Sequence, residues 1–223
     1  MTLAERRRAL IAGASKSRLP KEYQEVEWIG TDGSAYLVSD FNINNLDRFT
    51  IYYEYDPNGT TSNYVFGASD FPNTGHRFLH RYTDLVVNDV PGGIPRLSIP
   101  VGTGFYAIKV VADNVANTIT CYNDVGSIYS SVSWRNFKNF AGFGFLCNNY
   151  SGAPQNAVAQ ANTKIKRLDF YDDDRAEWVW IPVPCYRKAD GAIGIYDIVT
   201  GTFDTNQGSG SFIKGPDVNI LEV

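Results

Sequence analysis

The chain has 223 residues, a formal net charge of −4, and 14% aromatic residues. This length suffices for one large domain with a substantial core. A nucleic-acid-binding surface needs a basic stripe, which an acidic balance argues against, and no apolar run reaches the roughly 18 residues of a membrane-spanning helix. With 14 Tyr, 13 Phe, 20 Gly and one Met, the composition favours strands and turns over helices.

The first 18 residues predict a short helix followed by a polar hinge. Thr2 and Glu5 form a capping box, and an apolar stripe follows at helical spacing: Leu3, Leu10 and Ile11. A helix of about ten residues is marginal alone in water, so this one needs a partner. Two alternatives stay open: the helix packs against its own domain or frays at the terminus, or residues 1–18 attach the protein to something else. We expect residues 19–223 to form a separate folded domain.

The middle of the chain predicts strands. Residues 49–55 form a strand that ends at the turn 56–59, and 105–111 with 117–122 form a hairpin. Shorter apolar runs continue the pattern at 36–38, 64–66, 77–80, 85–87, 128–132, 143–146 and 165–171. About a dozen strands without a helical pattern between them favour a two-sheet sandwich. Residues 148–160 are predicted to be the longest polar surface loop.

Glu54 and Asp56 are the candidates for hydrolytic chemistry. Side chains two apart on a strand share a face, as the acid and nucleophile of a glycosidase require. However, Gly59 stands where a third carboxylate would be expected, and Asp-Pro-Asn-Gly is typical of a turn. We therefore expect a structural role for this segment and no enzymatic activity.

Metal sites have little support. Asp172, Asp173 and Asp174 could offer oxygens to Ca²⁺, although a solvated acidic turn explains the run as well. His76 and His80 would lie about 13 Å apart on a strand, too far to share an ion. No other metal and no cofactor are predicted.

Three cysteines, Cys121, Cys147 and Cys185, lie far apart in apolar surroundings and lack the C-x-x-C spacing of a metal site. We expect them to be buried and reduced, as in a protein that folds in a cytoplasm. The apolar run 9–14 is too short for the core of a signal peptide, so secretion by that route is not expected.

Loop residues supply the candidate glycan contacts. Sugars are held by exposed aromatic faces together with Asn, Asp and Arg side chains, and six residues fit this description: Trp134, Arg135, Asn136, Asn148, Asn149 and Tyr150. The alternative is that these aromatics close the ends of the sandwich.

The C-terminal stretch 177–215 predicts a β-meander. Apolar and aromatic runs alternate with turn signals at 190–191, 200–201 and 208–210. Pro182 and Pro184 cannot donate backbone hydrogen bonds, so their run is predicted to be an edge strand or to leave the sheet.

This stretch also resembles a known family motif, carried by Cys185, Tyr186, Arg187, Lys188, Asp190, Gly191, Ile193, Gly194, Tyr196, Asp197, Gly201, Phe203, Thr205, Asn206, Gly208, Gly210, Lys214 and Gly215. A matching opening motif consists of Leu19, Pro20, Glu22, Tyr23, Val26, Glu27, Ile29, Gly33 and Tyr36. Together they resemble the laminin-G/concanavalin A-like jelly-roll domains of bacteriophage and prophage virion proteins. The two motifs bracket residues 19–214.

The resemblance implies an all-β, concanavalin A-like (laminin-G-like) two-sheet jelly roll. It also implies a non-enzymatic virion protein of the tail, baseplate or head, displayed for host-surface or glycan adhesion and assembled in the bacterial cytoplasm. Phage appendages are commonly trimeric, so a homotrimer joined to other virion proteins through the N-terminal helix is expected. Two alternatives are a polysaccharide-cleaving enzyme on the same fold and a cellular adhesion module.

Overall fold

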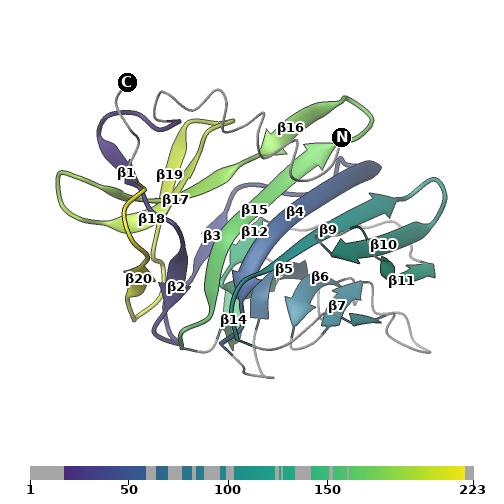
Figure 1. Ribbon diagram of the computed structural model, residues 1–223, viewed down its shortest axis with the longest axis horizontal. Helices are drawn as coiled ribbons and strands as arrows, with labels where there is room; N and C mark the ends of the chain where they lie inside the picture. Colours follow the sequence, from purple (N-terminus) through teal and green to yellow (C-terminus); the bar gives the residue numbers. More distant parts are fainter. Residues whose placement is uncertain are drawn as a thin grey trace.

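The computed structural model describes residues 18–58, 64–69, 77–81, 84–87, 96–98, 103–123, 126, 128–133, 142–150, 153–159 and 161–218. Within these ranges the protein consists of strands and turns arranged in three sheets (Figure 1). The predicted N-terminal helix, with Leu3, Leu10 and Ile11, lies outside the described residues. Among the residues that are described, no helix is long and apolar enough to span a membrane.

The front sheet has eight strands and faces the viewer in Figure 1. Its order is β11 (Ile128–Ser133), β10 (Thr118–Asn123), β9 (Tyr106–Asp113), β4 (Arg48–Asp56), β15 (Lys164–Asp172), β2 (Ile29–Thr31) and β20 (Phe212–Lys214), with β16 (Glu177–Trp180) paired to β15. The predicted strand at 49–55 and the predicted hairpin at 105–122 are confirmed as β4 and as β9 with β10.

The back sheet lies behind it and also has eight strands (Figure 1). Its path is β14 (Ala153–Val158), β13 (Cys147–Tyr150), β5 (Tyr64–Ser69), β6 (Arg77–Arg81), β7 (Asp84–Val87) and β8 (Arg96–Ser98), while β12 (Phe143–Phe145) joins β5 to β3 (Leu37–Ser39). The predicted polar loop at 148–160 is therefore wrong. β13 and β14 pair with each other, and β13 also lies parallel to β5, so distant backbone partners outweigh the polar composition.

Aromatic rings fill the space between the two sheets. Alternate residues of β4 turn Phe49, Ile51, Tyr53 and Tyr55 inward, where each is at most 1% exposed. Phe143 of the back sheet packs into the same core, with its ring centroid near those of five other rings: Phe170 at 5.1 Å, Phe66 at 5.7 Å, Trp180 at 5.8 Å, Phe41 at 6.1 Å and Phe78 at 6.4 Å. One continuous core therefore joins the two sheets.

A third, four-stranded sheet, the end sheet, contains β1 (Tyr23–Glu25), β17 (Pro182–Arg187), β18 (Ile193–Asp197) and β19 (Thr202–Thr205), in that order. The predicted C-terminal meander is confirmed for β17 to β19. β16 and β20, which were predicted to belong to it, pair instead with strands of the front sheet.

β17 lies between β1 and β18, but the proline run 182–184 pairs with β18 alone, so this part of the strand has the predicted edge character. The carbonyl of Pro184 accepts a hydrogen bond from the Val26 amide (2.9 Å), so the polar groups of Pro184 face β1. Pro182, two residues earlier, has the same orientation. The nitrogen of each proline, which carries no hydrogen, therefore faces away from β18, and the ladder to β18 loses no hydrogen bond. On the other side, β1 pairs only with residues 185–187.

The opening and closing segments fold against each other on the end sheet. The Tyr23 ring lies 4.9 Å from both Tyr196 and Phe203, over a small cluster of buried residues: Leu19, Val183 and Cys185. The two segments that carry the family resemblance therefore form one structural unit, although most of the chain separates them.

Asn206 and Gln207 complete this unit. Asn206 Oδ1 accepts from the backbone amides of Tyr36 (3.1 Å) and Gly208 (2.9 Å). The Gln207 amide bonds to both backbone groups of Val38, with its Oε1 accepting at 3.2 Å and its Nε2 donating at 2.9 Å, as a neighbouring strand would. A Cβ on Gly208 would come within 2.0 Å of the Ser34 carbonyl oxygen, so this contact requires glycine.

Candidate functional site

The predicted glycan contacts do not form one site in the described structure. Asn148 and Asn149 lie within β13 and are 0% and 1% exposed, so their predicted position on a surface loop is wrong. Asn149 Nδ2 donates instead to the Gly142 carbonyl oxygen (3.1 Å). Trp134, Arg135 and Asn136 lie outside the described residues, as does the side chain of Tyr150. Glycan contact by these six residues stays a prediction.

The acidic run at 172–174 has protein partners. Asp172 accepts from the Asp174 and Arg175 amides (2.9 and 3.0 Å), Asp173 accepts from the Thr50 hydroxyl (2.8 Å), and Asp174 pairs with Arg48. Across the described ranges, no three His, Cys, Asp or Glu side chains come together as a metal site requires. The run thus fastens the β15–β16 turn to β4, and calcium binding remains an untested prediction.

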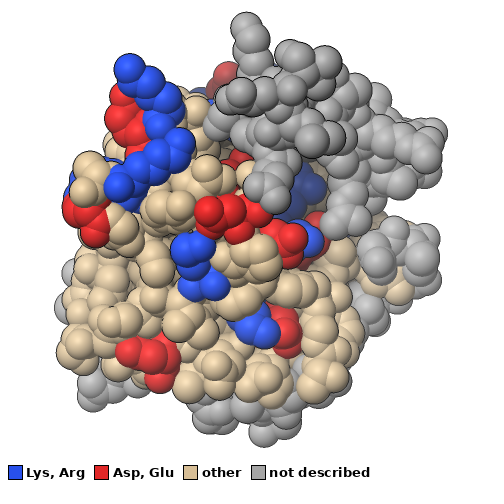
Figure 2. All heavy atoms as spheres, turned by 60° about the vertical axis from the view of Figure 1, so that its left-hand side comes forward, with Lys and Arg blue, Asp and Glu red and all other residues tan. Residues whose placement is uncertain are grey.

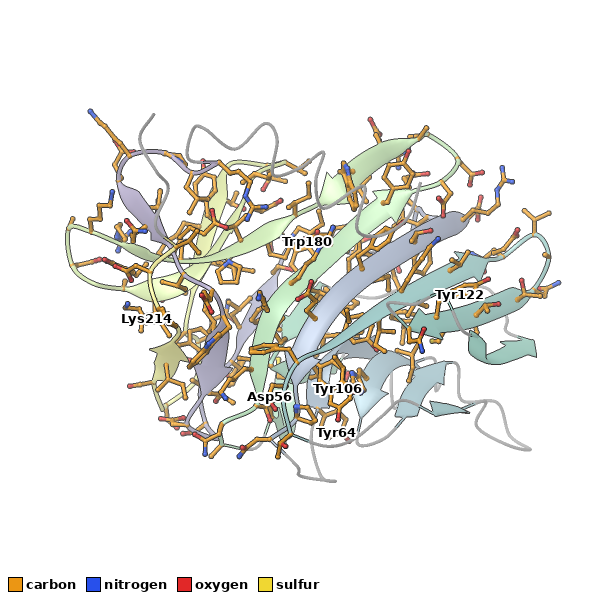
Figure 3. All side chains as sticks on the ribbon, viewed as in Figure 1. Asp56, Tyr64, Tyr106, Tyr122, Trp180 and Lys214 are labelled. Carbon is orange, nitrogen blue, oxygen red and sulfur yellow. The ribbon has the colours of Figure 1, made fainter. Side chains whose placement is uncertain are left out.

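Asp56 also has a structural role. Its Oδ1 accepts from the backbone amides of Asn58 (2.8 Å) and Gly104 (3.3 Å), and its Oδ2 accepts from Lys164 Nζ (3.1 Å). Figure 3 shows Asp56 with Tyr64 and Tyr106 at one end of the sandwich. The carboxylate therefore ties the turn after β4 to its two neighbouring strands, as the turn interpretation predicts.

The predicted cysteine environments are confirmed. Cys121, Cys147 and Cys185 are free and buried. Burial raises the pKa of each thiol to about 12. None of the three is therefore a nucleophile near neutral pH.

A different set of side chains gathers on the side of the front sheet that points away from the back sheet. We call this surface the outer face. The residues that alternate with the core positions of β4 point outward, and Tyr52 is at their centre. Cross-strand pairing places Lys109 of β9 and Asp169 of β15 beside Tyr52, and Tyr122 of β10 beside Lys109. Four neighbouring strands thus contribute one row of rings and charges. Figure 3 shows Tyr122 on β10, at one side of this row.

Tyr52 lies at the centre of this row, and its ring contacts three neighbouring side chains. Lys109 Nζ lies 5.7 Å from its ring centroid, Arg167 Cζ 5.4 Å, and the Trp178 ring 5.7 Å. These neighbours help to cover Tyr52, which is only 5% exposed. The accessible groups are therefore the ones that it positions. Trp178, which also packs edge-on against Tyr171 (5.1 Å), is partly exposed, as are Lys109 and Tyr122.

Arg167 and Asp169 bring a paired charge to the same face. The Arg167 guanidinium donates a hydrogen bond to Asp169, whose side chain is 10% exposed. Burial raises the pKa of the Asp169 carboxyl, and the attraction of Arg167 opposes that shift. Such a pair is held in place and can offer donors and acceptors to a polar ligand.

Phe105 marks the lower end of the outer face. It directly precedes β9, is 40% exposed, and has Lys166 Nζ 5.6 Å from its ring centroid. The arrangement of Phe105 with Lys166 repeats, at another level of the sheet, the ring-and-cation contact of Tyr122 with Lys109 (5.7 Å). Aromatic rings and cations therefore occur together at two levels of the same face.

Elsewhere on the surface, charges of both signs lie side by side. On the view in Figure 2, basic side chains lie next to acidic ones. Ion pairs of this kind include Arg187 with Asp190 (2.6 Å) and Lys214 with Asp217 (2.7 Å). Neither sign of charge dominates the described residues on this view.

The sequence predicts which residues of β4 point outward, but not which residues of other strands lie beside them. The alternation in 49–56 showed that Tyr52, Glu54 and Asp56 share a side of β4. It did not show which strands lie next to β4, and hence that Lys109, Tyr122 and Trp178 would meet there. That information resides in the pairing of strands far apart in the chain.

Comparison of the sequence with protein-family models and with curated proteins finds no match. Among solved structures, a Bacteroides ovatus protein whose proposed role is carbohydrate binding has a TM-score of 0.53 and 14% identity, over 88% of this chain and 62% of that one. A heptameric SAP-like pentraxin from Limulus polyphemus has a TM-score of 0.51 and 14% identity, over 90% and 98%. This chain thus spans less than two thirds of the Bacteroides protein. The likeness establishes the fold, a pentraxin-like jelly-roll sandwich, as the predicted fold class requires.

Proposed function

We propose that this protein is a non-enzymatic glycan-binding protein and that the outer face is its binding surface. The observation that carries the proposal is the presence of two partly exposed rings, Trp178 and Tyr122, beside the ordered charges of Lys109 and Arg167. Rings offer a flat apolar surface to a sugar, and the charged groups bond to its hydroxyls. The proposed carbohydrate-binding role of the Bacteroides ovatus protein, on the same fold, supports this assignment.

We further propose that the domain is displayed on a phage virion for adhesion to the host surface, after assembly in the bacterial cytoplasm. The support is the resemblance of the opening and closing motifs to phage virion domains. The alternative of a polysaccharide-cleaving enzyme predicts release of reducing ends from host glycans. A cellular adhesion module would instead be encoded away from portal, capsid and tail genes.

Replacing Trp178 with alanine should weaken glycan binding by about tenfold or more, the loss typical of an aromatic anchor. Titration calorimetry with the best ligand from a bacterial glycan panel measures it. Val199→Ala is the matched control, because Val199 is apolar and 46% exposed but lies beyond the outer face, next to the end sheet. Unchanged affinity in the Trp178 variant, with both variants folded by thermal unfolding, would contradict the proposed site.

Deleting residues 1–16 should leave a folded domain that no longer trimerises or joins the particle. The stripe of Leu3, Leu10 and Ile11 would contribute on the order of 5 kcal/mol per chain when buried in a partner, enough to matter for assembly. Light scattering gives the oligomeric state and thermal unfolding gives the stability. The control is a deletion of residues 1–23, which also removes Leu19 and Tyr23 from their cluster on the end sheet and should prevent folding. Normal assembly of the shorter deletion would rule out the attachment role.

A further inference from the structure

We infer that the ligand of the outer face is an extended glycan chain that runs diagonally across the front sheet, from Phe105 beside β9 to Trp178 on β16, rather than a single terminal sugar. This inference rests on the proposed glycan-binding function and adds the size and direction of the ligand. It follows from how the rings and charges are spaced along the front sheet.

The strand register gives the length of the site. Phe105 precedes Val111 by six positions along β9 (111 − 105), which corresponds to about 20 Å of strand. Val111 pairs with Thr50, Thr50 with Tyr171, and Tyr171 with Trp178, so Trp178 lies at the level of Val111. Phe105 and Trp178 are therefore at opposite ends of the face.

Contact groups occur at each level between these ends. At the lower end, Phe105 is 40% exposed beside Lys166. One step further, Arg167 pairs with Glu54 across the strands and keeps 20% of its side chain exposed. Lys109 and Tyr122 follow at the next level, and Trp178 comes last.

This succession fits a ligand that repeats. Each ring can receive the face of one sugar unit, and the charged groups between the rings can bond to the hydroxyl or carboxylate groups of the units that bridge them. A single sugar would contact only one level and leave the others unused. Because Tyr52 fixes Lys109, Arg167 and Trp178 in advance, little ordering of the protein would accompany binding.

The test uses size-fractionated oligosaccharides, from disaccharide to octasaccharide, prepared from bacterial capsular and O-chain polysaccharides. For a series that binds, affinity should rise with chain length and then level off once the ligand covers the face. Phe105→Ala and Trp178→Ala should each weaken the octasaccharide by about tenfold. The disaccharide occupies only one end of the face, so only the substitution at that end should lower the affinity for the disaccharide.

Val115→Ala is the control, since Val115 is 77% exposed on the β9–β10 turn, away from this path. The protein could instead bind disaccharide and octasaccharide with equal affinity, with Phe105→Ala leaving that affinity unchanged and Trp178→Ala lowering it. This result would overturn the inference of an extended ligand but leave the glycan-binding function in place. Absence of binding to every oligosaccharide in the panel would overturn both.

Discussion

Replacing Asp197 with alanine should lower the free energy of unfolding by about 3–5 kcal/mol. Asp197 is 2% exposed, and its Oδ1 accepts from the amides of Ile181 (3.0 Å) and Val199 (3.1 Å). Its Oδ2 accepts from the amide (3.3 Å) and the hydroxyl (2.7 Å) of Thr200. Alanine would remove all four bonds at the point where β17, β18 and the turn to β19 meet. Urea unfolding followed by tryptophan fluorescence measures the loss.

Asp190→Ala is the matched control for this prediction. Asp190 lies on the β17–β18 turn of the same sheet and pairs with Arg187, but the two side chains are 48% and 42% exposed, so its removal should change stability little. If the two variants lost equal stability, the special role of the buried carboxylate would be refuted.

Phe143→Ala should also cost about 3–5 kcal/mol, because it leaves a cavity where the two large sheets meet. The Phe143 side chain is fully buried among the rings of Phe41, Phe66, Phe170 and Trp180. Phe66 belongs to the back sheet, and Phe170 and Trp180 belong to the front sheet, so the cavity cannot close without moving a strand. The midpoint of urea unfolding should fall while its slope stays constant.

A surface variant provides the comparison. Val115→Ala, on an exposed turn, should stay within about 0.5 kcal/mol of the parent. A loss below about 1 kcal/mol for Phe143→Ala would mean that the neighbouring rings repack, and that the core between the sheets is more adaptable than its burial indicates.

The alternation of apolar and polar residues along the chain predicted the strands that bury one face. β4 follows from the alternation of Phe49, Ile51, Tyr53 and Tyr55 with outward residues, and the β9–β10 hairpin follows from two such runs around a short turn. Both elements place most of their apolar side chains on one face, so the sequence records which side is buried.

Distant pairing determined what the sequence could not predict. Residues 153–158 include no aromatic residue and only one β-branched residue, Val158, yet form β14 because β13 offers them backbone partners. Pro182 and Pro184 are tolerated in β17 because β1 is too short to reach them. The outer face has the same origin: Tyr52, Tyr122 and Trp178 are unremarkable in sequence and become neighbours only through the order of β10, β9, β4, β15 and β16.

The closure of the end sheet has a consequence for synthesis. β1 pairs with β17, so Tyr23 cannot meet Arg187 until 164 more residues (187 − 23) have been translated. At typical bacterial and eukaryotic rates this delay amounts to roughly ten to thirty seconds, during which β1 has no partner strand. A free strand edge invites aggregation, and β1 limits that risk by being three residues long and carrying Gln24 and Glu25. The polar character of β1 thus protects the nascent chain until β17 has been translated.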